Sequence, residues 1–305
     1  MKRVNLEYSD IPAYLPDIDY FLEKISNYDK FNFLRVNHGF IDSLYYAYPD
    51  YDILKTQLQN KEYDLIGKTC HQAYNDTDWG FKHFHGVSEN VWKYSSLILK
   101  MLVDNKNLSE SLDLSLSLGV GLNTHWGVWD IDNPIQTARV NFVKILTQLT
   151  NHTYIYSGVL KHYTIKKEIF EMFELLNNMN YEVIFLGPDF FKRYEQIFSI
   201  RNFNFIEIPK KGAIEHTETY IEKVKEIYQN SFKPTILFHM CGHIMSAKLV
   251  YELLNDNIFT MDVGRSFDIL IREEFINGNQ AEKCWTFLDD GGLNTYVDNL
   301  RNNSY

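Results

Sequence analysis

Short apolar runs rich in β-branched and aromatic residues alternate with amphipathic stretches from residue 181 onward. Such runs are typical of strands, and stretches with a 3.6-residue apolar period are typical of helices. Four successive strand–helix units indicate a parallel sheet with helices packed against it. The predicted strands lie within residues 181–188, 203–209, 234–242 and 258–264. The predicted helices span about 189–198, 213–228 and 244–254, and another begins near Ser266.

The run at 234–242 is apolar throughout, so we expect it to be a central strand buried on both faces. Two upstream strands are expected to join the same sheet. They are residues 31–36, after a helix over 18–28, and residues 154–157, before a helix over 165–179. The pattern therefore predicts an α/β fold with a Rossmann-like, doubly wound and mainly parallel sheet.

The region between the two upstream strands is predicted to be mainly helical, and we interpret it as a helical insertion or cap. Amphipathic helices are expected over residues 52–74, 88–103 and 136–149. The predicted organisation has three parts. Residues 1–50 hold the N-terminal helix and first strand of the α/β domain, residues 51–150 the insertion, and residues 151–305 the Rossmann-like nucleotide-binding portion with a C-terminal tail.

Composition and charge narrow the class of protein. The chain has 305 residues, of which 45% are hydrophobic, which is enough for a large core. Its net charge of -10 disfavours nucleic-acid binding, because an acidic surface repels phosphates. No apolar run approaches the ~20 residues of a membrane span, and no secretory signal opens the chain. We therefore expect no transmembrane segment and a cytoplasmic location, and a homo-oligomer is compatible with this composition.

Candidate ligand-binding residues follow the central strand. Ligands of open parallel sheets bind beyond the carboxyl ends of the strands, where helix N-termini point into the crevice. Gly242 would let the backbone approach a diphosphate, and the next helix would offer unpaired N–H groups. Ser246 would add a hydroxyl donor, and Gly187 ends the first of the four strands. His239 and His243 are further candidates in this segment; such a pair could ligate a metal, and the alternative is a pair of core or capping histidines. The alternative for this segment is a tight turn that binds no ligand.

A second candidate group follows the next strand and comprises Asp262, Gly264, Arg265 and Asp268. A carboxylate at this place can accept a hydrogen bond from a ribose or sugar hydroxyl, and an arginine can pair with a phosphate. The alternative is a helix capped by Ser266 with a surface ion pair nearby.

The signals for a metal site are fewer. Asp76 and Asp78 resemble the paired carboxylates that hold Mg²⁺ or Mn²⁺ on a nucleoside diphosphate, although such pairs are common in polar turns. The three cysteines lack zinc or disulfide spacing.

The chain also lacks GxSxG, GxxxxGK[ST], HExxH and a GxGxxG fingerprint at its strand–helix junctions. These absences count against a standard NAD enzyme and disfavour a methyltransferase.

Three stretches in order resemble the GT-D type glycosyltransferases. Residues 33–40 lie where that family has a strand ending in an Arg-Phe-Gly-Asp-Gly-Glu type run, residues 236–250 resemble its strand, glycine turn and helix, and residues 259–268 resemble its Asp-x-Gly element. The likeness covers roughly residues 18–45 and 150–272. It implies a Rossmann-like sheet that binds a sugar nucleotide.

The chain departs from that family at its DxE carboxylates, which fall on His38 and Phe40. A phenylalanine cannot ligate a cation. Arg35 and Gly39 carry over, and Asp42 is the nearest carboxylate. This leaves metal-independent transfer, a divalent metal (Mn²⁺ or Mg²⁺) held elsewhere, as at Asp76 and Asp78, or a binding protein that has lost activity.

The first functional hypothesis is transfer of a sugar from a nucleoside diphosphate sugar to a saccharide or other hydroxyl acceptor. The diphosphate would lie on the turn at Gly242 and His243, and Asp262 and Arg265 would orient the donor. Arg35 would offset charge on the leaving group, with His38 or Asp42 as general base. The rival hypotheses are an S-adenosylmethionine-dependent methyltransferase and a non-catalytic nucleotide-sugar or glycan-binding protein.

Overall fold

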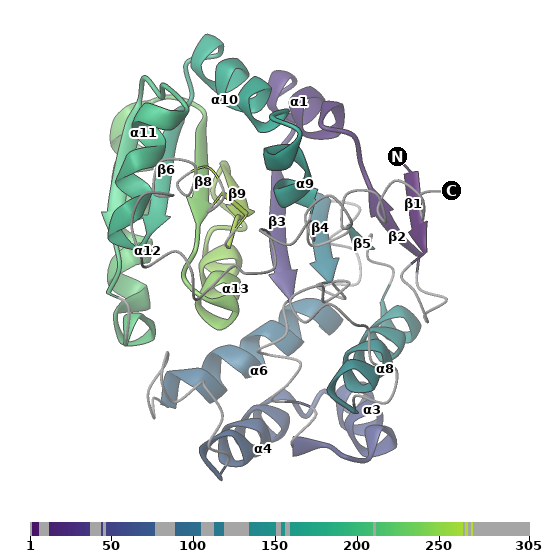
Figure 1. The fold of residues 1–305 in the computed structure, drawn as a ribbon. Coiled ribbons are helices and arrows are strands. Elements are labelled where there is room, and N and C mark those ends of the chain that lie inside the picture. The colour runs from purple at the N-terminus through teal and green to yellow at the C-terminus, as the bar shows by residue number, and fades with distance from the viewer. Residues whose placement is uncertain are drawn as a thin grey trace, which may run out of the picture.

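The structure is a computed structural model. It describes residues 2–5, 12–36, 44, 47–76, 89–104, 113–118, 134–150, 154–155, 159–209, 212–264, 266–267 and 270. The strands among these residues form one sheet in the order β1-β2-β5-β4-β3-β9-β8-β6-β7 (Figure 1). Their bounds are β1 Lys2–Asn5, β2 Pro12–Leu15, β3 Phe31–Val36, β4 Asp113–Leu118, β5 Tyr154–Ile155, β6 Glu182–Gly187, β7 Phe203–Glu207, β8 Thr235–His239 and β9 Ile258–Asp262.

The five strands β3, β9, β8, β6 and β7 are all parallel and are flanked by helices, which confirms the predicted α/β fold with a Rossmann-like parallel sheet. Strands β4, β5 and β2 extend the sheet in parallel beyond β3, and β1 pairs with β2 antiparallel. Between β6 and β8 the direction of winding reverses, because the chain leaves β6 toward β7 and leaves β8 toward β9. Such a reversal opens a crevice at the carboxyl ends of the strands, where α/β sheets take their ligands.

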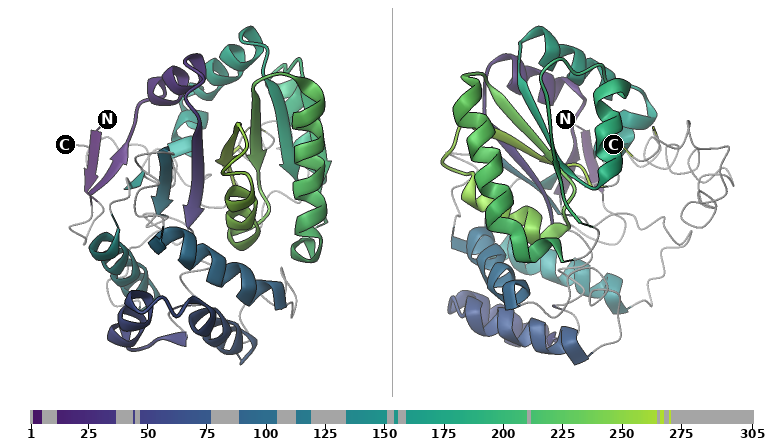
Figure 2. Two further views of the ribbon diagram at one scale, coloured as in Figure 1. Left: turned by 180° about the vertical axis from the view of Figure 1, so that it is seen from behind. Right: turned by 90° about the vertical axis from the view of Figure 1, so that its left-hand side faces the viewer.

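Helices cover both faces of the sheet. On one face, Ile184, Leu186 and Leu237 pack with residues of α12 and α13, and the right-hand view of Figure 2 shows these two helices on one side of the sheet. On the other face, Phe173 of α10 stacks near Phe185 and Phe238. The helices are α1 Asp19–Ser26, α3 Tyr51–Gln59, α4 Tyr63–Asp76, α6 Glu89–Asp104, α8 Pro134–Leu149, α9 Val159–Ile165, α10 Ile169–Asn178, α11 Tyr194–Ile197, α12 Thr217–Ser231 and α13 His243–Glu252, with short 3₁₀ turns η2 Asp189–Arg193 and η3 Ala213–His216.

A helical layer lies beyond the carboxyl ends of β3 and β4. Figure 1 shows α3, α4, α6 and α8 below the arrowheads of these strands. Helix α6 packs against both α4 and α13. Gly67 permits a close crossing, because a Cβ there would lie 2.2 Å from Ser96 Oγ of α6. This layer therefore covers the edge of the sheet where ligand-binding residues are expected.

The structure differs from the sequence-based elements at three places. The helix expected over 52–74 is two helices, α3 and α4, and Lys61 between them adopts a φ of 61°. The helix expected over 165–179 begins at Ile169 and follows a separate helix, α9. Strands β1, β2 and β4 were not predicted, and β4 lies inside the region expected to be helical.

Candidate functional site

An ion pair joins the carboxyl ends of β3 and β9. Arg35 Nη2 donates a hydrogen bond to Asp262 Oδ1 at 3.0 Å. The Arg35 side chain is 13% exposed and that of Asp262 is 5% exposed, so the pair is largely shielded from water. Both residues were predicted site residues, and the sheet brings them together although 227 positions separate them in the chain.

Gly264 provides the space that this pair needs. Its φ is 44°, and its N–H donates to Asp262 Oδ1 at 3.1 Å. A Cβ at this position would lie 1.3 Å from Arg35 Nη2, so the guanidinium lies directly on the glycine. The close approach of Arg35, together with the left-handed backbone, accounts for glycine here.

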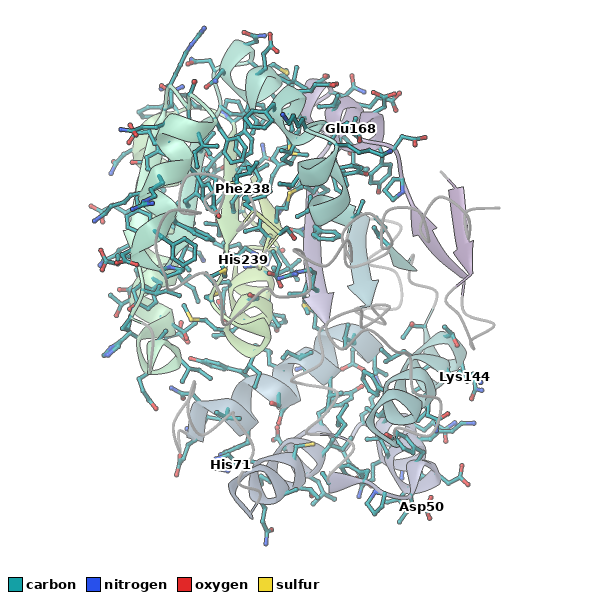
Figure 3. The ribbon with its side chains drawn as sticks, in the orientation of Figure 1. Asp50, His71, Lys144, Glu168, Phe238 and His239 are labelled. Carbon is teal, nitrogen blue, oxygen red and sulfur yellow. The ribbon has the colours of Figure 1, made fainter. Side chains whose placement is uncertain are left out.

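His239, which Figure 3 labels, lies beside Asp262 in the register of β8 and β9 and is fully buried. Burial lowers the pKa of His239 to about 4, an effect that the Asp262 carboxylate opposes and the Arg35 guanidinium reinforces. The imidazole is therefore neutral at pH 7. It is a predicted site residue that the structure brings next to the Arg35–Asp262 pair.

A short chain of polar atoms fixes the imidazole. His239 Nδ1 lies 3.1 Å from Ser246 Oγ, and Ser246 Oγ lies 3.3 Å from Cys241 Sγ. Burial raises the pKa of the Cys241 thiol, which stays protonated and can donate. Ser246 belongs to α13, so this chain of contacts links the first turn of that helix to the end of β8.

Two nitrogens of this cluster have no hydrogen-bond partner among the described residues. They are His239 Nε2 and Arg35 Nε, and both are buried. Buried polar atoms without a partner are rare in folded proteins, because each costs about 1–3 kcal/mol. A ligand atom that reached either nitrogen would remove that cost.

Two predicted glycines lie at the winding reversal, Gly187 at the end of β6 and Gly242 between β8 and α13. Gly242 precedes α13, is exposed, and adopts a φ of 80°. Its carbonyl accepts from Ser246 N–H at 2.8 Å, and the start of the helix lies on the same edge of the sheet as Asp262. Gly187 has a packing explanation, because a Cβ there would lie 2.5 Å from the Phe191 ring.

The remaining predicted residues lie outside the described part of the chain. These are His38, Gly39, Asp42, Asp78, Arg265 and Asp268, together with the side chains of Asp76, at the end of α4, and His243, at the start of α13. Within the described ranges, no group of three or more His, Cys, Asp or Glu residues could hold a metal ion. In the same ranges, no helix has both the length and the apolar character needed to span a bilayer.

Cys241 and the buried Asn32–Thr260 pair below the site are not among the residues predicted from the sequence. Thr260 Oγ1 donates to Asn32 Oδ1 at 2.8 Å, with both side chains fully buried. Asn32 gave one signal, since it is a polar residue between two phenylalanines in a predicted strand. Cys241 lay inside the segment already singled out but carried no spacing motif.

Comparison of the chain with models of known protein families, with characterised proteins and with solved structures yields no match.

Proposed function

We propose that this chain is a glycosyltransferase that binds a nucleoside diphosphate sugar at the carboxyl edge of β8, β9 and β3 and moves the sugar to a saccharide or other hydroxyl acceptor. One observation carries the proposal. The buried Arg35–Asp262 pair and the exposed turn at Gly242 lie on the same edge of a Rossmann-like sheet, beside a reversal of winding. Sheets of this kind take nucleotides at this edge.

The chemistry of the edge suits a diphosphate next to hydroxyl groups. The first turn of a helix such as α13 offers N–H groups without intrahelical partners and the positive end of the helix dipole, both of which favour phosphate oxygens. Gly242 has no side chain to block the approach and is exposed. The charge of Arg35 is offset by Asp262, so this pair would meet the hydroxyl groups of the donor rather than its phosphates. Asp262 would accept hydrogen bonds from the donor.

The reaction itself rests on the resemblance to GT-D type glycosyltransferases in residues 33–40, 236–250 and 259–268. That family's DxE carboxylates fall on His38 and Phe40 here. The proposal therefore includes transfer without a metal ion at this position, with Mn²⁺ or Mg²⁺ dependence decided by experiment. A chain that binds sugar nucleotides without turning them over would be a binding protein instead.

A thermal-shift screen tests the proposal. The purified protein is mixed with UDP-, GDP-, CDP- and dTDP-linked sugars, S-adenosylmethionine and NAD, each with and without Mn²⁺. A ligand at 100 times its Kd adds about 2.7 kcal/mol to the free energy of unfolding, which raises Tm by several degrees. We expect a rise with one class of sugar nucleotide. A rise with S-adenosylmethionine alone, or with none of the sugar nucleotides, would overturn the proposal.

A matched pair of variants checks that the ligand uses the described edge. Arg35→Lys keeps the charge but loses the planar fork, and we expect it to weaken sugar-nucleotide binding about tenfold. Lys192→Arg makes the reverse exchange at the exposed Lys192–Glu207 pair, and we expect no change in binding. Equal affinities of the wild type and Arg35→Lys would place the nucleotide elsewhere. Release of free sugar or transfer to an acceptor, followed by chromatography, then separates an enzyme from a binding protein.

A further inference from the structure

We propose that Arg35, Asp262 and His239 form a subsite for hydroxyl groups of the ligand, and that its phosphates bind elsewhere, at the start of α13. This inference rests on the proposed function, because it takes the ligand to be a nucleoside diphosphate sugar. It assigns the cluster to the ribose or to the transferred sugar. The two sources share one chemistry, a hydroxyl that both donates and accepts.

The charge of the cluster argues against a phosphate. Arg35 and Asp262 form an ion pair at 3.0 Å, so their charges offset each other, and His239 beside them is neutral. A phosphate oxygen here would meet the Asp262 carboxylate without a surplus of positive charge to hold it. An uncharged hydroxyl meets no such repulsion, and it can donate to the carboxylate.

The orphaned nitrogens argue for an acceptor in the same place. His239 is 0% exposed, and its Nε2 has no partner among the described residues. Arg35 Nε is likewise buried and lacks a partner within the described ranges. A hydroxyl that donates to Asp262 still has lone pairs that accept from these N–H groups. The cluster therefore offers an acceptor for the proton of a sugar hydroxyl and N–H donors for its lone pairs.

The contacts of His239 allow the tautomer that this role requires. The Cys241 thiol can donate to Ser246 Oγ at 3.3 Å, and the Ser246 hydroxyl can then donate to His239 Nδ1 at 3.1 Å. That direction leaves the proton of the neutral ring on Nε2. Ser246 and Cys241 thus act as positioning residues.

The exposure of the three side chains defines the direction of approach. Arg35 keeps 13% of its side chain exposed and Asp262 keeps 5%, whereas His239 is fully buried. A ligand hydroxyl therefore meets the guanidinium and carboxylate first. It reaches His239 directly or through one retained water, which is nearly as good a partner as a direct contact.

Binding measurements on three variants test the subsite. His239→Leu removes the donor with an apolar side chain of similar size, and His239→Gln keeps an N–H donor at a similar reach. Thr260→Val removes the buried hydrogen bond to Asn32 one layer below and serves as the control for lost stability. The probes are UDP-glucose, UDP, dTDP-glucose and the sugar nucleotide that gives the largest Tm shift.

We expect His239→Leu to weaken binding of the hydroxyl-bearing probe about tenfold, with substantial recovery in His239→Gln and no change in Thr260→Val. If the tenfold loss is seen with UDP as well as UDP-glucose and is absent with dTDP-glucose, the hydroxyl is the 2′-OH of the ribose. If it requires the glucose, the hydroxyl belongs to the transferred sugar.

Two results would overturn the subsite while the proposed function stands. One is sugar-nucleotide binding that is equal in His239→Leu and the wild type. The other is an equal loss in His239→Leu and Thr260→Val, which would assign the loss to stability; an equal loss of His239→Leu across all probes would instead assign the contact to the 3′-hydroxyl that they share. Failure of every sugar nucleotide to bind the wild type would overturn the proposed function and this inference together.

The tautomer gives a second readout that requires no ligand. In ¹⁵N spectra of protein labelled at histidine, we expect His239 at pH 7 to be neutral with its proton on Nε2. Ser246→Ala should shift the populations of the two tautomers, because Nδ1 loses its partner. A wild-type ring that is charged, or that has its proton on Nδ1, would contradict the assignment of Nε2 as a donor.

Discussion

The two faces of β3, β8 and β9 differ sharply in chemistry. On one face, Phe31, Phe33, Phe238 and Phe259 are buried among rings of α1, α10 and neighbouring strands. On the other face, the same strands bury polar residues, namely Asn32, Thr260, His239 and Asp262. Phe238 and His239 are consecutive residues, and Figure 3 labels both. Successive side chains of a strand point to opposite faces, so Phe238 lies in the structural core and the next residue, His239, lies in the candidate site.

The difference shows how a buried site can be kept without loss of the fold. An aromatic face stabilises through area and ring packing and has no polar atoms to satisfy. A polar face gains little net stability from each hydrogen bond, and it loses stability wherever a nitrogen lacks a partner. We therefore expect substitution of the buried phenylalanines to affect stability alone, and changes at His239 or Asp262 to affect stability less and the ligand more.

The largest expected effect is on the aromatic face. Phe238→Ala removes a fully buried ring that lies 5.1 Å from the Phe173 ring and 5.0 Å from the Phe185 ring. We expect a loss of about 3–5 kcal/mol in the free energy of unfolding, measured by denaturant titration. Phe232→Ala is the control, because Phe232 is 96% exposed and its loss should change stability little. Equal losses of unfolding free energy in the two variants would contradict the importance given to the buried aromatic face.

Acid should act on the polar face through His239. The unfolded chain protonates this ring near pH 6.5, whereas the folded protein keeps it neutral down to about pH 4. The contribution of this pKa difference to the free energy of unfolding is therefore complete above pH 6.5 and is lost as the pH falls to about 4. Each pH unit in that window is worth about 1.4 kcal/mol, so the loss reaches roughly 3 kcal/mol. The difference in the free energy of unfolding between the wild type and His239→Gln, followed from pH 7 to pH 4, isolates this contribution. Parallel curves for the two proteins would refute it.

A smaller loss is expected at Gly264. Gly264→Ala puts a Cβ against the Arg35 guanidinium at a φ of 44°, so Arg35 must move and its bond to Asp262 must lengthen or break. We expect a loss of about 2 kcal/mol together with weaker sugar-nucleotide binding. Gly212→Ala is a matched control, since Gly212 has a φ of 72° and no atom within 4 Å of the added Cβ. If both variants lose the same stability, backbone strain alone explains the result.

The smallest expected effect is that of Thr260→Val. It removes the 2.8 Å hydrogen bond to Asn32 and leaves that amide less satisfied. We expect a loss of about 1 kcal/mol in thermal or denaturant unfolding and unchanged ligand affinity. A change in affinity would mean that the polar face acts as one unit down to this layer.

Much of the fold was predictable because the second half of the chain repeats one pattern. The apolar runs that became β6, β7, β8 and β9 are short, bounded by turn residues and separated by amphipathic helices. The missed strand β4, Asp113–Leu118, alternates leucine with polar residues, a period-2 signal that was overlooked between long helical patterns. The break between α3 and α4 has no proline or glycine, and Lys61 in a left-handed conformation was not foreseeable from residue type.

The site was predictable only in part, for a physical reason. Strand ends could be recognised from local pattern, so Arg35, His239 and Asp262 were all selected. Which strand ends meet depends on the order of strands in the sheet, and neither the β3–β9 contact nor the Arg35–Asp262 bond has a local signal. The path from Cys241 through Ser246 to His239 likewise arises from the way α13 leaves β8.

The pairing of β3 with β9 also constrains how the protein is made. Arg35 and Asp262 are 227 residues apart, and Lys30, just before β3, donates hydrogen bonds to the carbonyls of Leu253 and Leu254 after α13. A ribosome adds about 5–20 residues per second, so β3 waits on the order of ten seconds or more for its partner. During that time β4 can cover one edge of β3 while the other stays open. Residues 31–36, with apolar side chains at Phe31, Phe33, Leu34 and Val36, are thus a segment that a nascent chain must keep from premature pairing.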